Sequence, residues 1–382
     1  MSWLPEDSTR GTLVGRVWIP EANGIPAGPS VVALRADGVF DLSAHVPTMS
    51  SLLELPDPAA AVAAMAGRFI GDLAGITQGS VRMLAPCDLQ VIKAAGVTFA
   101  ASLLERVIEE QAKGDAAKAE SIRSRVVDLL GGSLASIVPG SVKAAELKQV
   151  LVQQGLWSQY LEVGIGPDAE VFTKAPVLSA VGPGAEVGIH SASAWNNPEP
   201  EIVLAVNSRG DIVGATLGND VNLRDVEGRS ALLLGKAKDN NASCAIGPFI
   251  RLFDSSYALD DVRRCVVSLE VQGTDGFVMR GESSMSQISR DPLDLVRQTV
   301  GAHHQYPDGF MLFLGTMFAP TQDRGAAGSG FTHHRGDVVR ISSPLLGSLV
   351  NTVNTSEDIT PWTFGLQAFF SNLSARGLLR PD

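Results

Sequence analysis

The chain is poor in the residues that mark several common protein classes. It holds only three cysteines in 382 residues, so a disulfide framework is not expected and a reducing cytoplasm is. No CxxC motif is present, which argues against a thiolate zinc site. Lys and Arg number 30 against 41 Asp and Glu, and the formal net charge of −11 disfavours binding to nucleic acid.

Long apolar segments are also missing. The most apolar windows, Ala59–Gly67 and Gly309–Gln322, are shorter than the ~20 residues that span a bilayer, so we expect no contact with a membrane interior. The first ten residues include Glu6 and Asp7 and lack the apolar core of a secretory signal. The catalytic motifs GxSxG and HExxH do not occur. These absences favour a cytoplasmic globular protein without a common hydrolase signature.

Glycine and proline are frequent, with 39 and 21 residues, which favours a mainly β or α+β fold with many turns. Short apolar runs predict a small β-rich N-terminal domain over residues 1–85. A helix is expected over Ala59–Ile76. Residues 86–382 are predicted to form one catalytic domain, with a helical insert over about 101–154 and short strands after it.

Two glutamates begin the most informative stretch. Glu199 and Glu201 stand two residues apart at the start of an apolar run, so in a strand their side chains point to one face. A turn at 207–210 predicts a hairpin, and a two-residue loop would pair Asp220 with Asn197 on that same face. A slip of one residue would turn Asp220 away, and the acidic face would then be merely solvated. If the three carboxylates do converge, they need a hard cation, Mg²⁺ by preference, with Mn²⁺ or Ca²⁺ as alternatives.

Basic residues follow this hairpin. Arg224 lies four residues after Asp220, and Lys238 lies in a segment with Lys236. A lysine near a metal-bound acid can bind a carboxylate, or act as a base if its pKa is lowered. The alternative for these side chains is a surface salt bridge.

Several motifs, in this order, resemble the fumarylacetoacetate hydrolase superfamily. They are EPE from Glu199, LGNDVNLRD, a lysine nine residues before Gly247, LGT at Leu314–Thr316 and GDVV at Gly336–Val339. Within the superfamily, the stretches AAGVTFAASLLERVIEE, GLWSQYLEVGIGPDAEVFTK, KDNNASCAIGPF and HQYPDGFMLFLGTMFAP are similar to bacterial 2-keto-3-deoxy-D-xylonate dehydratases. The resemblance covers roughly residues 86–382.

This resemblance implies a C-terminal mixed β-sandwich roll that holds Mg²⁺ on Glu199, Glu201 and Asp220. The implied reaction is dehydration of 2-keto-3-deoxy-D-xylonate to 2,5-dioxopentanoate in oxidative pentose breakdown. The partners implied are a small sugar-acid substrate and further copies of the chain, in a homodimer or homotetramer.

The hydrolases of the superfamily carry a lid histidine followed three residues later by a glutamate. Here those positions are Ser102 and Glu105, and Glu227 replaces their usual glutamine. Loss of the histidine disfavours activation of water and favours dehydration. A C–C hydrolase acting on a 2,4-diketo acid and a non-catalytic sugar-acid sensor are the alternative interpretations.

The expected catalytic residues are a base and an acid. Lys238 is expected to remove a C3 proton, and Glu105, with Glu109 one turn further on, to protonate the leaving hydroxyl. The two glutamates could instead form a solvated face with Arg106 or Lys113. The lid helix is expected to be mobile without ligand and to close over the metal. Substrate binding is assigned to Arg224, Ser102, Lys174 and Thr316.

Overall fold

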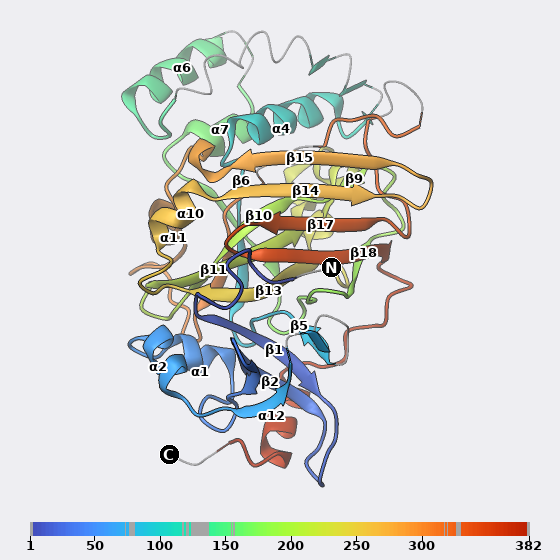
Figure 1. Ribbon diagram of the computed structural model, residues 1–382. Coiled ribbons are helices and arrows are strands. Elements are labelled where there is room, and N and C mark those ends of the chain that lie inside the picture. Colours follow the sequence, from blue (N-terminus) through green and yellow to red (C-terminus); the bar gives the residue numbers. More distant parts are fainter. Residues whose placement is uncertain are drawn as a thin grey trace.

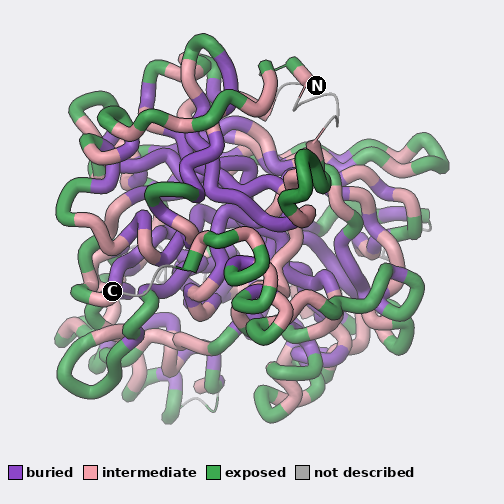
Figure 2. The backbone as a smooth tube through the Cα atoms, turned by 90° about the horizontal axis from the view of Figure 1, so that it is seen from below, coloured by how far each residue is buried: buried purple, intermediate pink, exposed green. Residues whose placement is uncertain are grey.

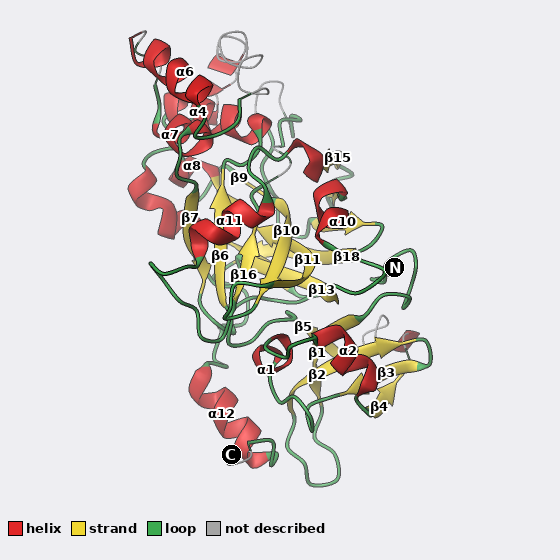
Figure 3. Ribbon diagram, turned by 90° about the vertical axis from the view of Figure 1, so that its left-hand side faces the viewer, coloured by secondary structure: helices red, strands yellow, loops and turns green. Residues whose placement is uncertain are grey.

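Two facing β-sheets form the body of the protein, with helices at both ends (Figures 1 and 3). The computed structural model describes residues 3–72, 74–75, 81–116, 118–119, 122–123, 137–153, 155, 157–316, 318, 320–325 and 330–379. The predicted α+β class with mixed sheets is therefore confirmed.

The larger sheet has eleven strands among the described residues, and only β16 and β6 pair in parallel within it. In spatial order its strands are β4 (Arg68–Gly71), β3 (Gly38–Asp41), β2 (Gly28–Arg35), β1 (Leu13–Ile19), β13 (Cys244–Leu252), β11 (Ile212–Asp220), β10 (Pro200–Val206), β16 (Phe310–Phe313), β6 (Val91–Gly96) and β7 (Glu170–Ala175), with β5 (Arg82–Leu84) on β1.

The smaller sheet lies across the larger one and has five strands in the described part of the chain. Their order is β15 (Val278–Ser284), β14 (Val266–Gln272), β17 (Val338–Ser343), β18 (Gly347–Thr355) and β8 (Glu186–Ile189). A short two-stranded ladder joins β9 (Asn196–Asn197) to β12 (Asn222–Leu223).

The helices lie mainly beyond the edges of the sheets. They are α1 (Met49–Leu53), α2 (Pro58–Ala64), α4 (Ala100–Ala112), α6 (Val142–Gln153), α7 (Gln159–Ile165), α8 (Arg224–Glu227), α9 (Leu234–Lys238), α10 (Leu259–Arg264), α11 (Pro292–Thr299) and α12 (Leu366–Ala375), with 3₁₀ turns η1 (Ala231–Leu233) and η2 (Met285–Gln287). No helix in these described segments is long and apolar enough to cross a membrane.

Strand β10 shows how the sequence builds the core. Every residue of β10 is buried, and its side chains alternate between the two faces of the sheet. Leu204 and its neighbours two residues away pack between the sheets with Leu269 and Ile341. Val203 and Ala205 pack on the opposite face. Strands buried on both sides run through the interior, and exposed turns surround them (Figure 2).

The strands of the predicted N-terminal domain continue the larger sheet, because Leu13 of β1 pairs with Arg251 of β13. The helix predicted over Ala59–Ile76 is confirmed at its start by α2 and is wrong for residues Arg68–Gly71. It ends at Ala64, and the chain continues as strand β4, where Phe69 pairs with Phe40 of β3. Pairing with a neighbouring strand overrides the helical pattern here.

The predicted helical insert contains α4 and α6. Helix α4 buries Leu103, Val107 and Ile108 in a cluster with Leu161 of α7. Residues 124–136 of the predicted insert lie outside the described residues.

Candidate metal centre and active site

The hairpin of β10 and β11 carries the three acidic residues, in a register different from the predicted one. Glu201 pairs with Gly218, and the Asp220 amide donates to the Glu199 carbonyl at 3.0 Å. The prediction that Asp220 lies opposite Asn197 is therefore wrong, because the loop is longer than two residues and the register shifts near Val206. The difference is an even number of residues, so the face of Asp220 is unchanged.

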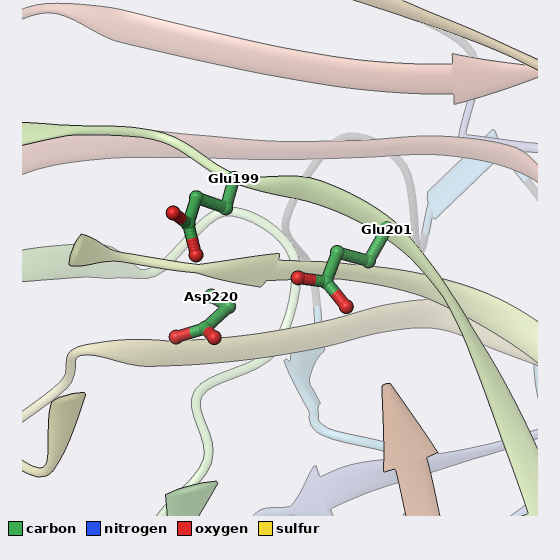
Figure 4. Close-up of side chains that lie close together, drawn as sticks. All are labelled: Glu199, Glu201 and Asp220. Atoms are coloured by element: carbon green, nitrogen blue, oxygen red, sulfur yellow. The ribbon is translucent and has the colours of Figure 1, made fainter. Parts of the chain in front are cut away.

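The three carboxylates converge as predicted (Figure 4). Their nearest oxygens lie within 4.8 Å of one another, and Glu199, Glu201 and Asp220 are each at most 2% exposed. The Gly315 amide donates to the Glu201 carboxylate at 2.7 Å. Gly315 has a φ of +99°, and a Cβ there would collide with a neighbouring side chain, so glycine permits this approach of the backbone.

Two buried lysines contact this cluster. Lys238 donates to Glu199 and, at 3.0 Å, to Asp220. Burial opposes the charge on Lys238, but Asp220 and Glu199 outweigh it and raise the pKa of the ammonium. Lys174 is fully buried and lies 2.8 Å from Asp220. Lys174 therefore holds Asp220 in place.

One stripe of helix α4 faces the cluster. Ser102, Glu105, Arg106 and Glu109 follow the i, i+3, i+4, i+7 spacing, and all four are buried. Arg106 donates to Glu109 at 2.7 Å and also contacts Glu199. A buried ion pair therefore joins the predicted lid helix to the acidic triad, which consists of Glu199, Glu201 and Asp220.

Arg224 lies beneath the same helix. It donates to Glu109 at 2.7 Å, to Glu105 at 3.1 Å and to the Pro320 carbonyl at 3.0 Å, and its guanidinium stacks 4.3 Å from the Trp195 ring. Burial alone would raise the pKa of Glu109, but the charges of Arg106 and Arg224 have the larger effect. The pKa of Glu109 therefore lies below its usual value. Glu109 is thus an ionised anchor for two arginines.

Strand β7 brings a further carboxyl group to the site. Glu170 and Phe172 line the cavity beside the triad, and Lys174 continues the same face of the strand. Burial, reinforced by the charge of Glu227, raises the pKa of Glu170 to about 7. A carboxyl group that titrates near neutrality can both accept and donate a proton.

The balance of acidic and basic side chains among the described residues suits a divalent cation at the triad. Burial, Asp220 and Glu199 raise the pKa of Glu201 well above its usual range. Carboxylates at this site outnumber cationic side chains by two, and oxygen ligands are what Mg²⁺ prefers. The carboxylates are Glu105, Glu109, Glu170, Glu199, Glu201, Asp220 and Glu227, and the cations are Arg106, Arg123, Lys174, Arg224 and Lys238.

Two small cavities, each of about 10 Å³, adjoin the triad. Both are lined by Ser102, Arg106, Glu199 and Thr316. Sites for small molecules usually exceed ~300 Å³. Helix α4 therefore lies closed over the site, and a substrate requires Arg106 or the helix to move.

The sequence interpretation left out two of these residues. Arg106 was considered only as a surface partner of the glutamates, although it completes the helical stripe. Glu170 is absent from the predicted site. Glu170, Phe172 and Lys174 alternate along the strand, so Glu170 shares a face with Lys174, which is in the predicted site. The residue spacing indicates that both share a face with predicted site residues, but it does not show what that face contacts.

A model of the fumarylacetoacetate (FAA) hydrolase C-terminal family matches residues 149–354, just over half of the chain. The chain belongs to the fumarylacetoacetate hydrolase family. The family resemblance drawn from the motifs is thereby confirmed.

Two curated relatives have names that describe an activity. A Haloferax volcanii protein, named as a probable 2-keto-3-deoxyxylonate dehydratase, is 31% identical over 196 residues, 51% of this chain and 64% of the relative. The 2-dehydro-3-deoxy-D-arabinonate dehydratase of Saccharolobus solfataricus is 29% identical over 194 residues, 50% of this chain and 60% of the relative. The matches thus span less than two thirds of each relative.

Two solved structures share the fold. A hexagonal crystal form of 2-keto-3-deoxyarabinonate dehydratase aligns with a TM-score of 0.63 at 19% identity, covering 90% of this chain and 99% of that one. A 2-keto-3-deoxy-D-arabinonate dehydratase complexed with magnesium and 2,5-dioxopentanoate aligns with a TM-score of 0.62 at 19% identity, with the same coverage of both chains.

Proposed function

We propose that this protein is a magnesium-dependent hydro-lyase that converts 2-keto-3-deoxy-D-xylonate to 2,5-dioxopentanoate. The observation that carries the proposal is the buried triad of Glu199, Glu201 and Asp220 with Lys238 beside it. The activity named for the two relatives, and the complex of a dehydratase of this fold with magnesium and 2,5-dioxopentanoate, support the choice of metal and reaction.

The triad residues would hold the metal through carboxylate oxygens. A divalent cation bound there supplies Lewis acidity, which polarises the carbonyl of a 2-keto acid and acidifies its C3 protons. The chain's own residues must then remove one C3 proton, protonate the C4 hydroxyl as its C–O bond breaks, and release water. This elimination leaves a C3=C4 double bond conjugated with the C2 carbonyl. Removal of a C5 proton and return of a proton to C3 then give the C4=C5 enol, which takes a proton at C4 to become the aldehyde.

Two residues on the cavity wall are placed for these proton transfers. The raised pKa of Lys238 suits donation of a proton better than its removal from C3, so Lys238 as the base stays a prediction. Lys238 and Glu170 line the cavity from α9 and β7, on separate elements. Glu170 has a pKa near neutrality, as proton transfer requires. Glu105 forms ion pairs with Arg224 and Arg123. Glu109 forms ion pairs with Arg224 and Arg106. These contacts favour a role for both glutamates in positioning the arginines. Glu105 as the proton donor therefore stays a prediction for mutagenesis.

Hydrolysis of a C–C bond in a 2,4-diketo acid is the competing reaction. It needs an activated water, and no histidine is found among the described residues lining the two small cavities. The Ser102 hydroxyl at the lid position donates to the Phe99 carbonyl at 2.9 Å. A dehydration needs no water nucleophile, so this lining favours the dehydratase.

The test is turnover of 2-keto-3-deoxy-D-xylonate by the purified protein, with formation of 2,5-dioxopentanoate followed directly. We expect turnover with Mg²⁺, its loss with EDTA, and its return when Mg²⁺ is added back. An acylpyruvate assayed in parallel for pyruvate release should react slowly or not at all. Full activity after EDTA, or fast acylpyruvate cleavage, contradicts the proposal.

We further propose that the enzyme works in the cytoplasm, in oxidative pentose breakdown, as a homodimer or homotetramer. Light scattering of the purified protein measures its assembly state. A strictly monomeric active enzyme would contradict that part of the proposal.

A further inference from the structure

Arg106 occupies the boundary between the two small cavities at the triad. The side chain comes from α4, is buried, and lines both cavities. Its Nη1 donates to Glu109 at 2.7 Å and lies 3.0 Å from a Glu227 oxygen. Its Nη2 donates to Glu199. One amino group is therefore anchored on two carboxylates outside the triad, and the other is bound to a triad member.

The other cations at the cavities are arranged differently. All three donor nitrogens of Arg224 contact groups outside the triad. Their acceptors are Glu109, Glu105 and the Pro320 carbonyl. Lys238 is a single ammonium held between Glu199 and Asp220. Among the described arginines, only Arg106 has an ion pair with a triad carboxylate.

A divalent cation and Arg106 compete for the charge of Glu199. A metal ion that binds Oε1 of Glu199 would take the oxygen that the Nη2 group of Arg106 contacts, while Nη1 would stay anchored on Glu109 and Glu227. A buried guanidinium donor without a partner is costly, and a carboxylate is its strongest match. The anchored Nη1 keeps the guanidinium oriented toward the cavity.

We propose that Arg106 determines specificity for the substrate carboxylate, and that metal binding at the triad releases Arg106 for this role. Metal would then bind before the anion. The anion is a 2-keto acid, a choice that rests on the proposed function. Because Arg106 belongs to α4, the same contact would hold that helix against the site while the substrate is bound.

The proposal predicts opposite changes in two affinities for Arg106→Met. Calorimetric titration of metal-stripped protein should show Mg²⁺ binding ~3–10-fold more tightly, because a competing cation has been removed. At saturating Mg²⁺, pyruvate should bind ~10–100-fold more weakly, because a charge-assisted hydrogen bond has been lost. Pyruvamide, which lacks the carboxylate, should bind the variant and the wild type about equally.

Two further variants complete the design. Arg106→Lys keeps the charge but not the planar fork, so Mg²⁺ affinity should stay near wild type while the preference for pyruvate over pyruvamide falls. Arg335→Met removes an exposed arginine paired with Asp358 and should change neither affinity.

Weaker binding of both Mg²⁺ and pyruvate in Arg106→Met would show a merely structural role and overturn the proposal. Unchanged binding of either ligand would overturn it too. If Arg106→Met does not fold, the loss of preference for pyruvate over pyruvamide in Arg106→Lys decides the matter. These are binding measurements without turnover, so failure of the protein to dehydrate 2-keto-3-deoxy-D-xylonate would leave their outcome readable.

Discussion

Glu201→Gln is the substitution that tests the metal site most directly. The change removes one carboxylate charge and keeps the size of the side chain. The amide oxygen can still accept the hydrogen bond from the Gly315 amide, which is 2.7 Å in the wild type. Because burial and two neighbouring carboxylates disfavour the charge of Glu201, the metal-free variant should be at least as stable as the metal-free wild type.

The size of the metal effect follows from linkage. At a Mg²⁺ concentration of ~100 times Kd, binding stabilises the wild type by ~2.7 kcal/mol. At ~2.1 cal/mol/K per residue, a chain of 382 residues has an unfolding entropy of ~0.8 kcal/mol/K, so Tm rises by ~3 °C. Outer-shell changes already cost 10–100-fold in metal affinity, so loss of a direct ligand should cost at least ~100-fold. The stabilisation then falls to ~0.4 kcal/mol, or ~0.5 °C.

The assay is thermal unfolding of both proteins in EDTA and in Mg²⁺, with turnover measured on the same samples. Glu282→Gln, an exposed change of the same kind on β15, is the matched control and should behave as the wild type does. A Glu201→Gln variant that keeps the full Mg²⁺-dependent rise in Tm would refute the assignment of Glu201 as a ligand. A metal-free variant that unfolds well below the wild type would refute the electrostatic reasoning.

Three other changes test neighbouring parts of the structure. Glu170→Gln should lower kcat more than ~100-fold and remove an ionisation near pH 7 from the pH–rate profile, while Mg²⁺ affinity stays within ~3-fold. Gly96→Ala would place a Cβ 1.9 Å from the Glu170 carboxylate, so kcat should fall while Tm stays nearly constant. Asp337→Asn should cost ~3 kcal/mol in denaturant unfolding at pH 7, because Asp337 is buried against Arg324 and His333. The folded-state pKa of Asp337 is lowered, so this difference should shrink as the pH falls below ~4.

The acidic triad could be predicted from the sequence because its geometry is local. Side chains two residues apart in a strand share a face, and a hairpin returns its second strand alongside the first. Glu199, Glu201 and Asp220 therefore converge even though the predicted register differed from the observed one. The prediction survived because the difference was an even number of residues.

The helix predicted over Ala59–Ile76 fails only beyond α2, and the failure has the opposite explanation. Its apolar periodicity is compatible with a helix, but residues Arg68–Gly71 lie beside β3 and complete its hydrogen bonds. Which partner strand is available depends on the folded sheet, and a window of the sequence contains no information on it.

The roles of Arg106 and Glu170 also depend on contacts between distant segments. Periodicity shows which face of α4 or β7 each residue shares, but it cannot show what that face meets. Packing of α4 beside α7 brings Arg106 to Glu199, 93 residues further along the chain. Pairing of β7 with β6 sets Glu170 against Gly96. The pKa of a carboxyl group depends on burial and on surrounding charges. Here those charges come from three helices and from Glu199, just before β10, which only the complete fold brings together.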